Sequence, residues 1–205
     1  MPPLNNRRKS TIKKTKVVSN LTPYQAHKKK WINCEGCHLC ENRTQTVLFK
    51  GKIPCEVLII GEAPGVSEDV LGKPFKGPAG NYLQTMLEKS GLSNYALGFT
   101  NLVACLPDKN DQGKIGEPDK EAIKACTDRL EEMIQICNPQ IIITAGNLSK
   151  KHLQKIKPNL KETIKFYEII HPAAILHQLD ESQKSLARHR TLCTFEEVID
   201  EIVPF

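Results

Sequence analysis

The 205-residue sequence predicts an α/β fold, namely a three-layer α/β/α sandwich around a four-stranded, mainly parallel sheet. Apolar runs of strand length alternate four times with longer segments of helical periodicity. Right-handed crossovers between parallel strands then place helices on both faces of the sheet. In addition, a polar signature follows each predicted strand, and open α/β sheets bind ligands beyond the carboxyl ends of their strands. These two observations predict one ligand pocket at one edge of the sheet.

The predicted strands are short and mostly apolar, as expected for strands that helices cover on both faces. Residues 56–61 (EVLIIG) lie between Pro54 and a glycine turn, and residues 97–104 form the second strand. The third and fourth strands are residues 140–145 and 166–170. The chain length suits one domain of this kind with a tail.

Four segments between and after these strands have helical spacing of apolar residues. Residues 79–90 form the first helix, which Gly91 ends, and Pro118 opens a second helix that runs to residue 137. Residues 148–155 form a short third helix, and residues 181–202 form a terminal one. No internal repeat is present in the sequence.

Basic residues are concentrated at the amino terminus. Residues 1–30 carry nine of the 29 Lys and Arg residues and none of the 23 Asp and Glu residues. We expect this segment to be a flexible basic arm that binds phosphate backbones, and residues 31–205 to form the folded domain, with Trp31 at its start. A solubilising tail, a localisation signal and an organelle transit peptide are the alternatives for the arm.

The sequence lacks the features of membrane and secreted proteins. No apolar run approaches the roughly 20 residues of a membrane helix, and the amino terminus lacks the apolar stretch of a secretory signal. We therefore expect a soluble, intracellular monomer without a membrane partner, in the cytoplasm or nucleoid, or in the nucleus or an organelle of a eukaryote.

Eight cysteines in such a chain indicate a metal site rather than disulfides. Cys34 and Cys37 form a C-x-x-C pair, Cys105 follows the second strand, and Cys126 lies in a helix. Four thiolates suit zinc and an iron–sulfur cluster equally well. Cys40 is kept as an alternative ligand because it lies three residues beyond Cys37. The remaining cysteines are expected to be buried small hydrophobic residues: Cys55, Cys137 and Cys193.

Carboxylates follow the first strand in the turn GEAPG at 61–65. This turn lacks the Gly-Lys-Ser/Thr of a P-loop and the G-x-G-x-x-G of dinucleotide-binding proteins. Glu62 lies on the turn, and Glu68 and Asp69 lie just beyond it. A carboxylate at this place is suited to general base chemistry or to stabilising a cation in a transition state. The alternative is a solvated acid that caps a turn.

Three further residues are candidates for binding or chemistry. Phe75 lies in a loop rich in Gly and Pro, where an aromatic ring is a platform for a planar ligand, although core packing explains it equally well. Asn101 ends a strand with the donor and acceptor that can read a pyrimidine edge. His171 follows the last strand and could donate to a developing oxyanion, or be structural.

Taken in order, the motifs resemble those of the iron–sulfur uracil-DNA glycosylases of the family 4 type, between Cys34 and Leu176. The similar motifs are C-x-x-C-x-L from Cys34, GEAPG-x-x-ED from Gly61, G-x-PF-x-GPAG from Gly72, TN-x-x-x-C from Thr100, P-x-I-I-x-x-x-G from Pro139 and HPA from His171. The resemblance implies the fold of that superfamily for residues 31–205, uracil-containing DNA, single- or double-stranded, as the partner, and hydrolysis of the N-glycosidic bond of uracil in base-excision repair.

The resemblance also implies roles for particular residues. It favours a structural [4Fe–4S] cluster over zinc. Glu62 matches the catalytic acidic position, with Glu68 assisting, and His171 is expected to stabilise the departing base. Phe75 is expected to stack on uracil and Asn101 to bind its polar edge. The implied cluster ligands are Cys34, Cys37, Cys105 and Cys126, and the implied substrate-binding residues are Ala63, Phe75 and Asn101.

The sequence departs from the family pattern at several places. Lys76 follows the proposed stacking ring, residues 106–119 are less basic than expected, and His177 stands where relatives often have Arg. The alternatives are an iron–sulfur DNA-binding protein that does not cleave, and a glycosylase for another modified or deaminated base. A relative that captures uracil-DNA covalently is disfavoured because the Arg-rich insertion of such proteins is missing between Cys105 and Cys126.

Overall fold

The computed structural model describes residues 21–202. A five-stranded sheet with the order β1-β3-β2-β4-β5 lies at its centre. Strands β2 to β5 are parallel, and β1 pairs with β3 in the antiparallel direction. The strands are β1 Lys50–Gly51, β2 Val57–Gly61, β3 Leu97–Asn101, β4 Ile141–Ala145 and β5 Lys165–Ile169. The predicted sandwich is confirmed. The predicted number of four strands is wrong, because β1 has only two residues, which are too few to show a strand pattern in the sequence.

Eight α-helices surround the sheet within the described residues. They are α1 Pro23–Trp31, α2 Val66–Leu71, α3 Pro78–Ser90, α4 Lys120–Ala125, α5 Thr127–Cys137, α6 Asn147–Ile156, α7 Pro172–Leu176 and α8 Glu181–Glu201. Short 3-10 turns lie at His38–Cys40, Leu92–Asn94 and Lys157–Asn159. Helices α2 and α7 were not predicted because six and five residues are too few for a helical period to be recognised. None of the described helices is long and apolar enough to cross a bilayer.

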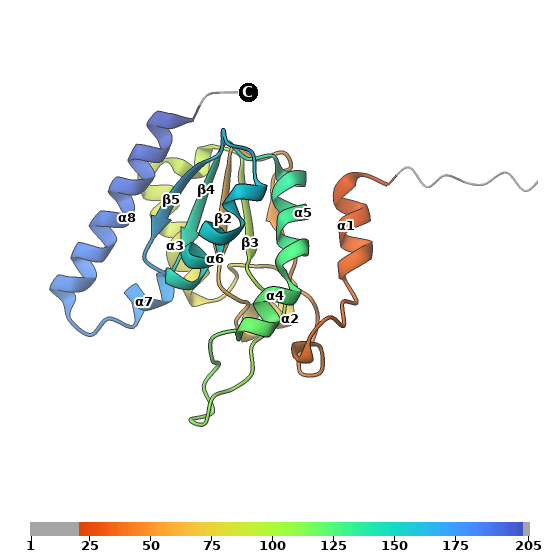
Figure 1. The fold of residues 1–205 in the computed structure, drawn as a ribbon. Helices are drawn as coiled ribbons and strands as arrows, with labels where there is room; N and C mark the ends of the chain where they lie inside the picture. Colours follow the sequence, from red (N-terminus) through yellow and green to blue (C-terminus); the bar gives the residue numbers. More distant parts are fainter. Residues whose placement is uncertain (1–20, 203–205) are drawn as a thin grey trace, which may run out of the picture.

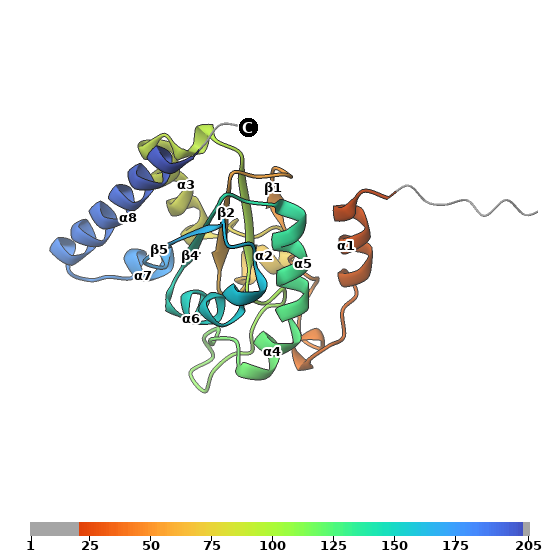
Figure 2. The same ribbon diagram turned by 45° about the horizontal axis from the view of Figure 1, so that its top comes forward.

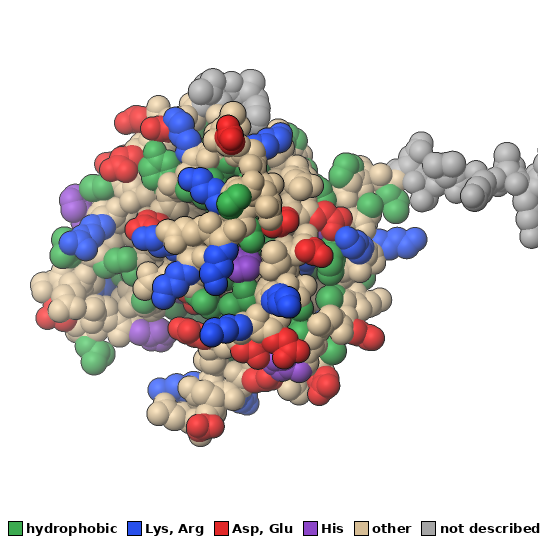
Figure 3. All heavy atoms as spheres, in the orientation of Figure 1, with side chains coloured by type: hydrophobic (Ala, Val, Ile, Leu, Met, Phe, Trp, Pro, Cys, Tyr) green, Lys and Arg blue, Asp and Glu red, His purple; other side chains and the backbone are tan. Residues whose placement is uncertain are grey.

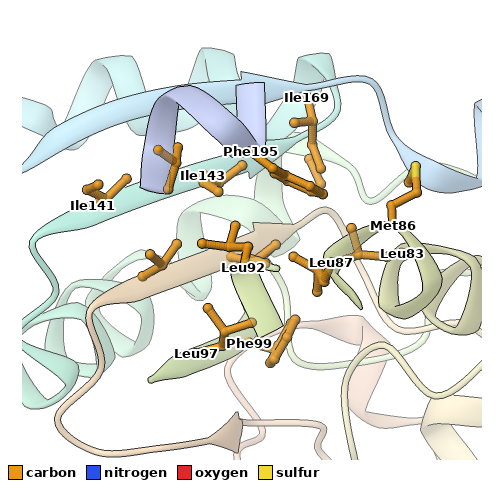
Figure 4. Close-up of a cluster of buried hydrophobic side chains, with 14 of the residues drawn as sticks. Leu83, Met86, Leu87, Leu92, Leu97, Phe99, Ile141, Ile143, Ile169 and Phe195 are labelled. Carbon is orange, nitrogen blue, oxygen red and sulfur yellow. The ribbon is translucent and has the colours of Figure 1, made fainter. Parts of the chain in front are cut away.

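Alternating side chains of the strands form two cores, one on each face of the sheet. Along β2, Val57 and Ile59 pack in one cluster with Phe195 of α8. Figure 4 shows Phe195 of this cluster beside Ile143 of β4. Leu58 and Ile60 point to the opposite face and pack with side chains of α5 and α6. All five residues of β2 are buried, which explains the nearly continuous apolar run in the sequence.

The helices form the outer layers of the sandwich. Figures 1 and 2 show α3, α7 and α8 on one side of the sheet and α5 on the other, with α1 outside α5. Helix α3 contacts both α7 and α8, and α6 packs against β4. This arrangement leaves the carboxyl ends of the parallel strands at one edge of the sheet, where loops and helix amino termini meet.

The predicted helix over 118–137 is two helices. Asp119 caps α4, because its side chain accepts a hydrogen bond from the Ala122 amide at 2.7 Å, so the helix begins after Pro118. Cys126 then separates α4 from α5, with φ −89° and ψ −3°. The break places Cys126 at a corner between two helices instead of within one straight helix.

Packed structure begins earlier than Trp31. Helix α1 has a capping box, in which Thr22 and Gln25 exchange hydrogen bonds, and it packs against α5. His27 on its inner face is fully buried. The predicted boundary of the arm at residue 30 is therefore wrong for residues 22–30, and residues 1–20 of the arm lie outside the described residues.

Candidate active site

Three residues at the carboxyl ends of β2, β3 and β5 meet around one hollow of about 530 Å³. Glu62 follows β2, Asn101 ends β3, and His171 lies two residues after β5. Phe75 enters the same wall from the loop between α2 and α3, beside Ala63 of the turn after β2. The parallel strand order brings these residues together, as expected from their positions in the sequence.

The sequence predicts a second strand over residues 97–104, but β3 ends three residues earlier, at Asn101. Beyond Asn101 the chain leaves the regular ladder, but the Leu102 amide donates to the Gly61 carbonyl at 3.0 Å and the Val103 amide to the Glu62 carbonyl at 3.2 Å. The chain after β3 is thus hydrogen-bonded to the turn that carries Glu62.

The Glu62 carboxylate is half-buried at the amino terminus of α6. Its Oε1 accepts a hydrogen bond from the Leu148 amide at 3.3 Å. Burial raises the pKa of Glu62; the Leu148 hydrogen bond lowers it, and the nearby Glu117 carboxylate raises it. Gly146, with φ +102°, makes room for this carboxylate, because a side chain there would come within 2.4 Å of Oε1. A carboxylate with a raised pKa is suited to accept a proton or to face a developing cation.

His171 caps α7 and thereby has a defined tautomer. Its Nδ1 accepts a hydrogen bond from the Ala173 amide at 3.2 Å. Burial lowers the pKa of His171, and the charge of Glu68 opposes this shift only in part. At neutral pH the imidazole is therefore neutral and carries its hydrogen on Nε2, which makes it a hydrogen-bond donor toward a ligand.

Phe75 has a backbone conformation that few residues with side chains adopt. Its φ is +53°, in the left-handed region, which costs of order 1–3 kcal/mol for such a residue. Gly80 allows this arrangement, because a side chain there would lie 2.3 Å from the Phe75 carbonyl carbon. The ring packs at 5.7 Å, centroid to centroid, from Phe99 of β3 and lines the hollow. Strain at a pocket residue indicates that the surrounding chain holds it in place.

Gly61 lies between the Phe75 ring and the Asn101 amide. A side chain at this position would lie 2.4 Å from Asn101 Oδ1 and 2.8 Å from Phe75 Cζ. The glycine at the end of β2 therefore lets an aromatic ring and an amide approach the same point. Such a pair can stack on a planar ring and hydrogen-bond to its edge.

Glu68 is buried and holds the loop that carries Phe75. Its Oε1 accepts hydrogen bonds from the Lys76 amide at 3.0 Å and the Gly77 amide at 2.7 Å, and its Oε2 accepts one from the Gly65 amide at 3.0 Å. Lys50 Nζ also donates to the Phe75 carbonyl, at 3.3 Å. Burial, and then the charge of Lys76, lower the pKa of Lys50 to about 8. Both oxygens of Glu68 are thus engaged with the backbone of the pocket.

A second hollow of about 700 Å³ adjoins the first and shares Glu62, Glu117 and His171 with it. This second hollow is lined by Gly146 and Asn147 at the start of α6, together with Lys151 of α6 and Arg190 of α8. Figure 3 shows Lys and Arg side chains gathered over the middle of the molecule, where Figure 1 places α6. The basic residues of this helix are Lys150, Lys151 and Lys155. Lys150 pairs with Glu168.

Glu117 was not predicted to lie at the site. It stands in the loop between β3 and α4, which extends from the body in Figure 1, and it lines both hollows. The sequence held no signal for it, because a single Glu before Pro118 in an irregular loop has no motif and no period. Only the fold of this loop over the sheet edge brings the carboxylate to Glu62.

The four predicted ligand cysteines are neighbours. Cys37, Cys105 and Cys126 lie in one cluster of packed side chains. Burial raises the pKa of Cys37, and the nearby thiols of Cys126, Cys34 and Cys40 raise it further. Burial likewise raises the pKa of Cys105 to about 11. Cys40 therefore lies close to the group as well, so the structure keeps it as an alternative ligand.

Two of these sulfur atoms accept hydrogen bonds. Arg43 Nη1 donates to Cys105 Sγ at 3.2 Å, and the Gly36 amide donates to Cys34 Sγ at 3.4 Å. Donors of this kind stabilise thiolates, which are the form of cysteine that binds metals. Within residues 21–202, however, no group of three or more His, Cys, Asp or Glu side chains has the arrangement of a metal site. Cys55 and Cys137 are packed in the core as predicted. The prediction is wrong for Cys193, which is only partly buried on α8.

Comparison with known proteins identifies the family. Residues 49–192 match the Uracil DNA glycosylase superfamily. The type-4 uracil-DNA glycosylase of Pyrobaculum aerophilum is 34% identical over 175 residues, which cover 76% of this chain and 87% of that protein. The chain belongs to this superfamily, in its type-4 branch. The resemblance inferred from the motifs is confirmed.

Another member of the branch aligns over a shorter stretch. The type-4 uracil-DNA glycosylase of Saccharolobus solfataricus is 40% identical over 129 residues, 62% of this chain. These residues span only 57% of the length of that protein. Among solved structures, the crystal structure of wild-type Pedobacter heparinus SMUG2 superposes with a TM-score of 0.57 at 14% identity, over 72% of this chain and 77% of that one. At this identity the likeness concerns the fold alone.

Proposed function

We propose that this protein is a monofunctional uracil-DNA glycosylase, which hydrolyses the N-glycosidic bond of uracil in DNA and leaves an abasic site for base-excision repair. The observation that carries the proposal is the meeting of Glu62, Phe75, Asn101 and His171 around one hollow in a member of this superfamily. The type-4 relatives named above support the substrate.

The hollow has groups for both charges that develop in this reaction. Cleavage of the glycosidic bond leaves positive charge on the sugar and negative charge on the departing uracil. The Glu62 carboxylate stabilises the cationic sugar and orients the attacking water. The neutral imidazole of His171 donates its Nε2 hydrogen to the uracil oxygen that gains charge, because Nδ1 is already occupied by the Ala173 amide.

Recognition uses other residues that line the same hollow. A base inside a duplex must leave the stack before it reaches the hollow, at a cost of a few kcal/mol. Phe75 stacks on the extruded uracil, Asn101 hydrogen-bonds to its polar edge, and Ala63 contacts it from the turn beside Glu62. The phosphate backbone next to the extruded nucleotide follows the adjoining hollow, where Lys151 and Arg190 attract it.

Glu68 has a positioning role in this mechanism. Its two oxygens accept three backbone hydrogen bonds around the Phe75 loop, so the carboxylate holds the stacking ring instead of contacting the substrate. This differs from the assisting catalytic role expected from the sequence.

A [4Fe–4S] cluster held by Cys34, Cys37, Cys105 and Cys126 completes the proposal. The proximity of these thiols and the hydrogen bonds to two of the sulfurs support a shared metal group. When bound, the cluster cross-links the segment after α1 to the chain after β3 and to the corner between α4 and α5. Zinc is the alternative for four thiolates, and the iron and sulfide content of protein purified without oxygen distinguishes the two.

The test is release of free uracil from single- and double-stranded oligonucleotides by anaerobically purified protein. We expect rapid release by the wild type and a loss of at least about 100-fold in Glu62→Ala and His171→Ala. Glu162→Gln is the control, because this exposed carboxylate lines neither hollow. Iron-loaded protein that binds the oligonucleotide without releasing uracil would contradict the proposal. Hypoxanthine and xanthine substrates would then test the alternative of another deaminated base.

A further inference from the structure

The most deeply buried charged side chain of the described residues lies directly beneath the site. Arg129, on the inner face of α5, is 1% exposed. None of the ion pairs found among residues 21–202 involves it. A buried guanidinium without a carboxylate is costly unless strong hydrogen bonds replace its hydration. The partners of its hydrogen bonds therefore indicate the role of this residue.

These hydrogen bonds all go to the end of β3. Nη2 donates to the Asn101 carbonyl at 2.5 Å and to the Leu102 carbonyl at 2.8 Å, and Nη1 donates to Thr100 Oγ1 at 3.3 Å. The guanidinium thus grips three successive residues, and the middle one carries the amide that faces the hollow. Nε has no partner among the described atoms.

The series of hydrogen bonds that begins at Arg129 continues to the turn that carries Glu62. The peptide groups whose carbonyls accept from Arg129 also donate onward, through the Leu102 amide to Gly61 and through the Val103 amide to Glu62. A charged donor at one end of such a chain polarises each peptide and strengthens the next bond. Arg129 therefore supports the ends of two neighbouring strands at once.

We propose that Arg129 is a positioning residue that sets the orientation of Asn101 and of the Glu62 turn, and so determines how selectively the site holds uracil over thymine. The proposal rests on the uracil-DNA glycosylase function proposed above. Arg129 does not touch the substrate; it acts through the backbone of the residues that do.

The first experiment compares Arg129→Met and Arg129→Lys with the wild type. Met fills similar space but leaves the Asn101 and Leu102 carbonyls without their donor, whereas Lys keeps the charge but lacks the fork that spans them. Because a displacement of about 1 Å at an active site can cost about 100-fold, we expect kcat/KM for uracil release to fall by about that factor in Arg129→Met. Partial recovery in Arg129→Lys is expected.

The second measurement does not depend on cleavage. It is the ratio of affinities for oligonucleotides with one 2′-fluoro-deoxyuridine, which resists hydrolysis, and with thymidine at the same place. We expect this ratio to fall in Arg129→Met and in Asn101→Ala, and to fall no further in the double variant, since Arg129 acts through Asn101.

Leu130→Ala is the matched control for general destabilisation. Leu130 is the next residue on α5 and fully buried in the core, and its truncation creates a cavity without removing a hydrogen-bond donor. We expect it to lower the melting temperature without changing the affinity ratio. Iron content is measured in every variant.

Two results would overturn the proposal. One is an unchanged affinity ratio and kcat/KM in folded, iron-loaded Arg129→Met or, if that variant does not fold, in Arg129→Lys. The other is a drop in the affinity ratio in Leu130→Ala that is as large as the drop in Arg129→Met. A drop of the same size when Arg129→Met is added to Asn101→Ala would count equally. If the wild type releases no uracil, the proposed function fails, while the affinity ratio still decides the role of Arg129.

Discussion

Replacing Glu68 by Gln separates a positioning role from a catalytic one. The carboxylate accepts three backbone hydrogen bonds, at 2.7, 3.0 and 3.0 Å, from the amides of Gly77, Lys76 and Gly65. Bonds to a charged acceptor contribute about 1.5–3 kcal/mol each, so the three together exceed the strain of roughly 1–3 kcal/mol at the left-handed Phe75. The loop is therefore held in the strained conformation in the wild type.

In Glu68→Gln that balance changes. The side-chain NH₂ opposes the Gly65 amide, which removes one bond, and the remaining two become neutral bonds of about 0.5–1.5 kcal/mol each. Their sum is comparable with the strain, so the Phe75 loop populates other conformations. We expect kcat/KM for uracil release to fall by about 10- to 100-fold, with every limb of the pH profile retained. The limb of His171 moves to lower pH, because the Glu68 charge that raises the pKa of His171 is gone.

The assay is the pH profile of kcat/KM, and Asp69→Asn is its matched control. Asp69 is the next acid on α2 and is also buried, but it accepts from the Thr44 amide, at 2.9 and 3.1 Å, and does not line the hollow. We expect Asp69→Asn to keep its kcat/KM. An unchanged kcat/KM in Glu68→Gln would refute the positioning role of Glu68. The loss of one limb of its pH profile would show that Glu68 itself exchanges a proton.

Three further outcomes are expected. Glu117→Gln removes a charge that raises the pKa of Glu62, so the acidic limb of the kcat/KM profile moves to lower pH; a limb that stays in place would show that burial alone sets it. The pKa of His171 is lowered in the folded protein, so the unfolded chain binds the proton first as the pH falls through about 6.5, and acidification reduces stability. His171→Asn can still cap α7 and should lose less melting temperature than the wild type between pH 7 and pH 5; an equal loss would assign the effect to other groups. Deleting residues 1–20 removes six basic residues but keeps the Thr22 cap of α1, so DNA affinity and its salt dependence should fall while iron content stays constant; an unchanged salt slope would show that the arm does not contact DNA.

The sequence alone determined much of the fold because the signals were local. The apolar run of β2 and the spacing of α3 and α8 lie within single segments, where burial on two faces or on one stripe leaves a readable pattern. Parallel strand order then placed Glu62, Asn101 and His171 at one edge, because each ends a strand or lies within two residues of its end. Helix α1 was not predicted because lysines dominate it and leave no apolar period. Strand β1 was not predicted because it has only two residues.

Tertiary structure decided what each side chain at that edge does. Glu68 is a candidate site residue in the sequence because it lies just beyond the GEAPG turn. Only the folded loop, however, brings the amides of Lys76 and Gly77 to its oxygens. Glu117 and Arg129 carry no motif, and they reach the site through a loop and a helix that lie far along the chain from Glu62. Charge and hydrogen bonding act through space, so the partners that set a pKa or a side-chain orientation depend on contacts between distant segments, which a local pattern does not contain.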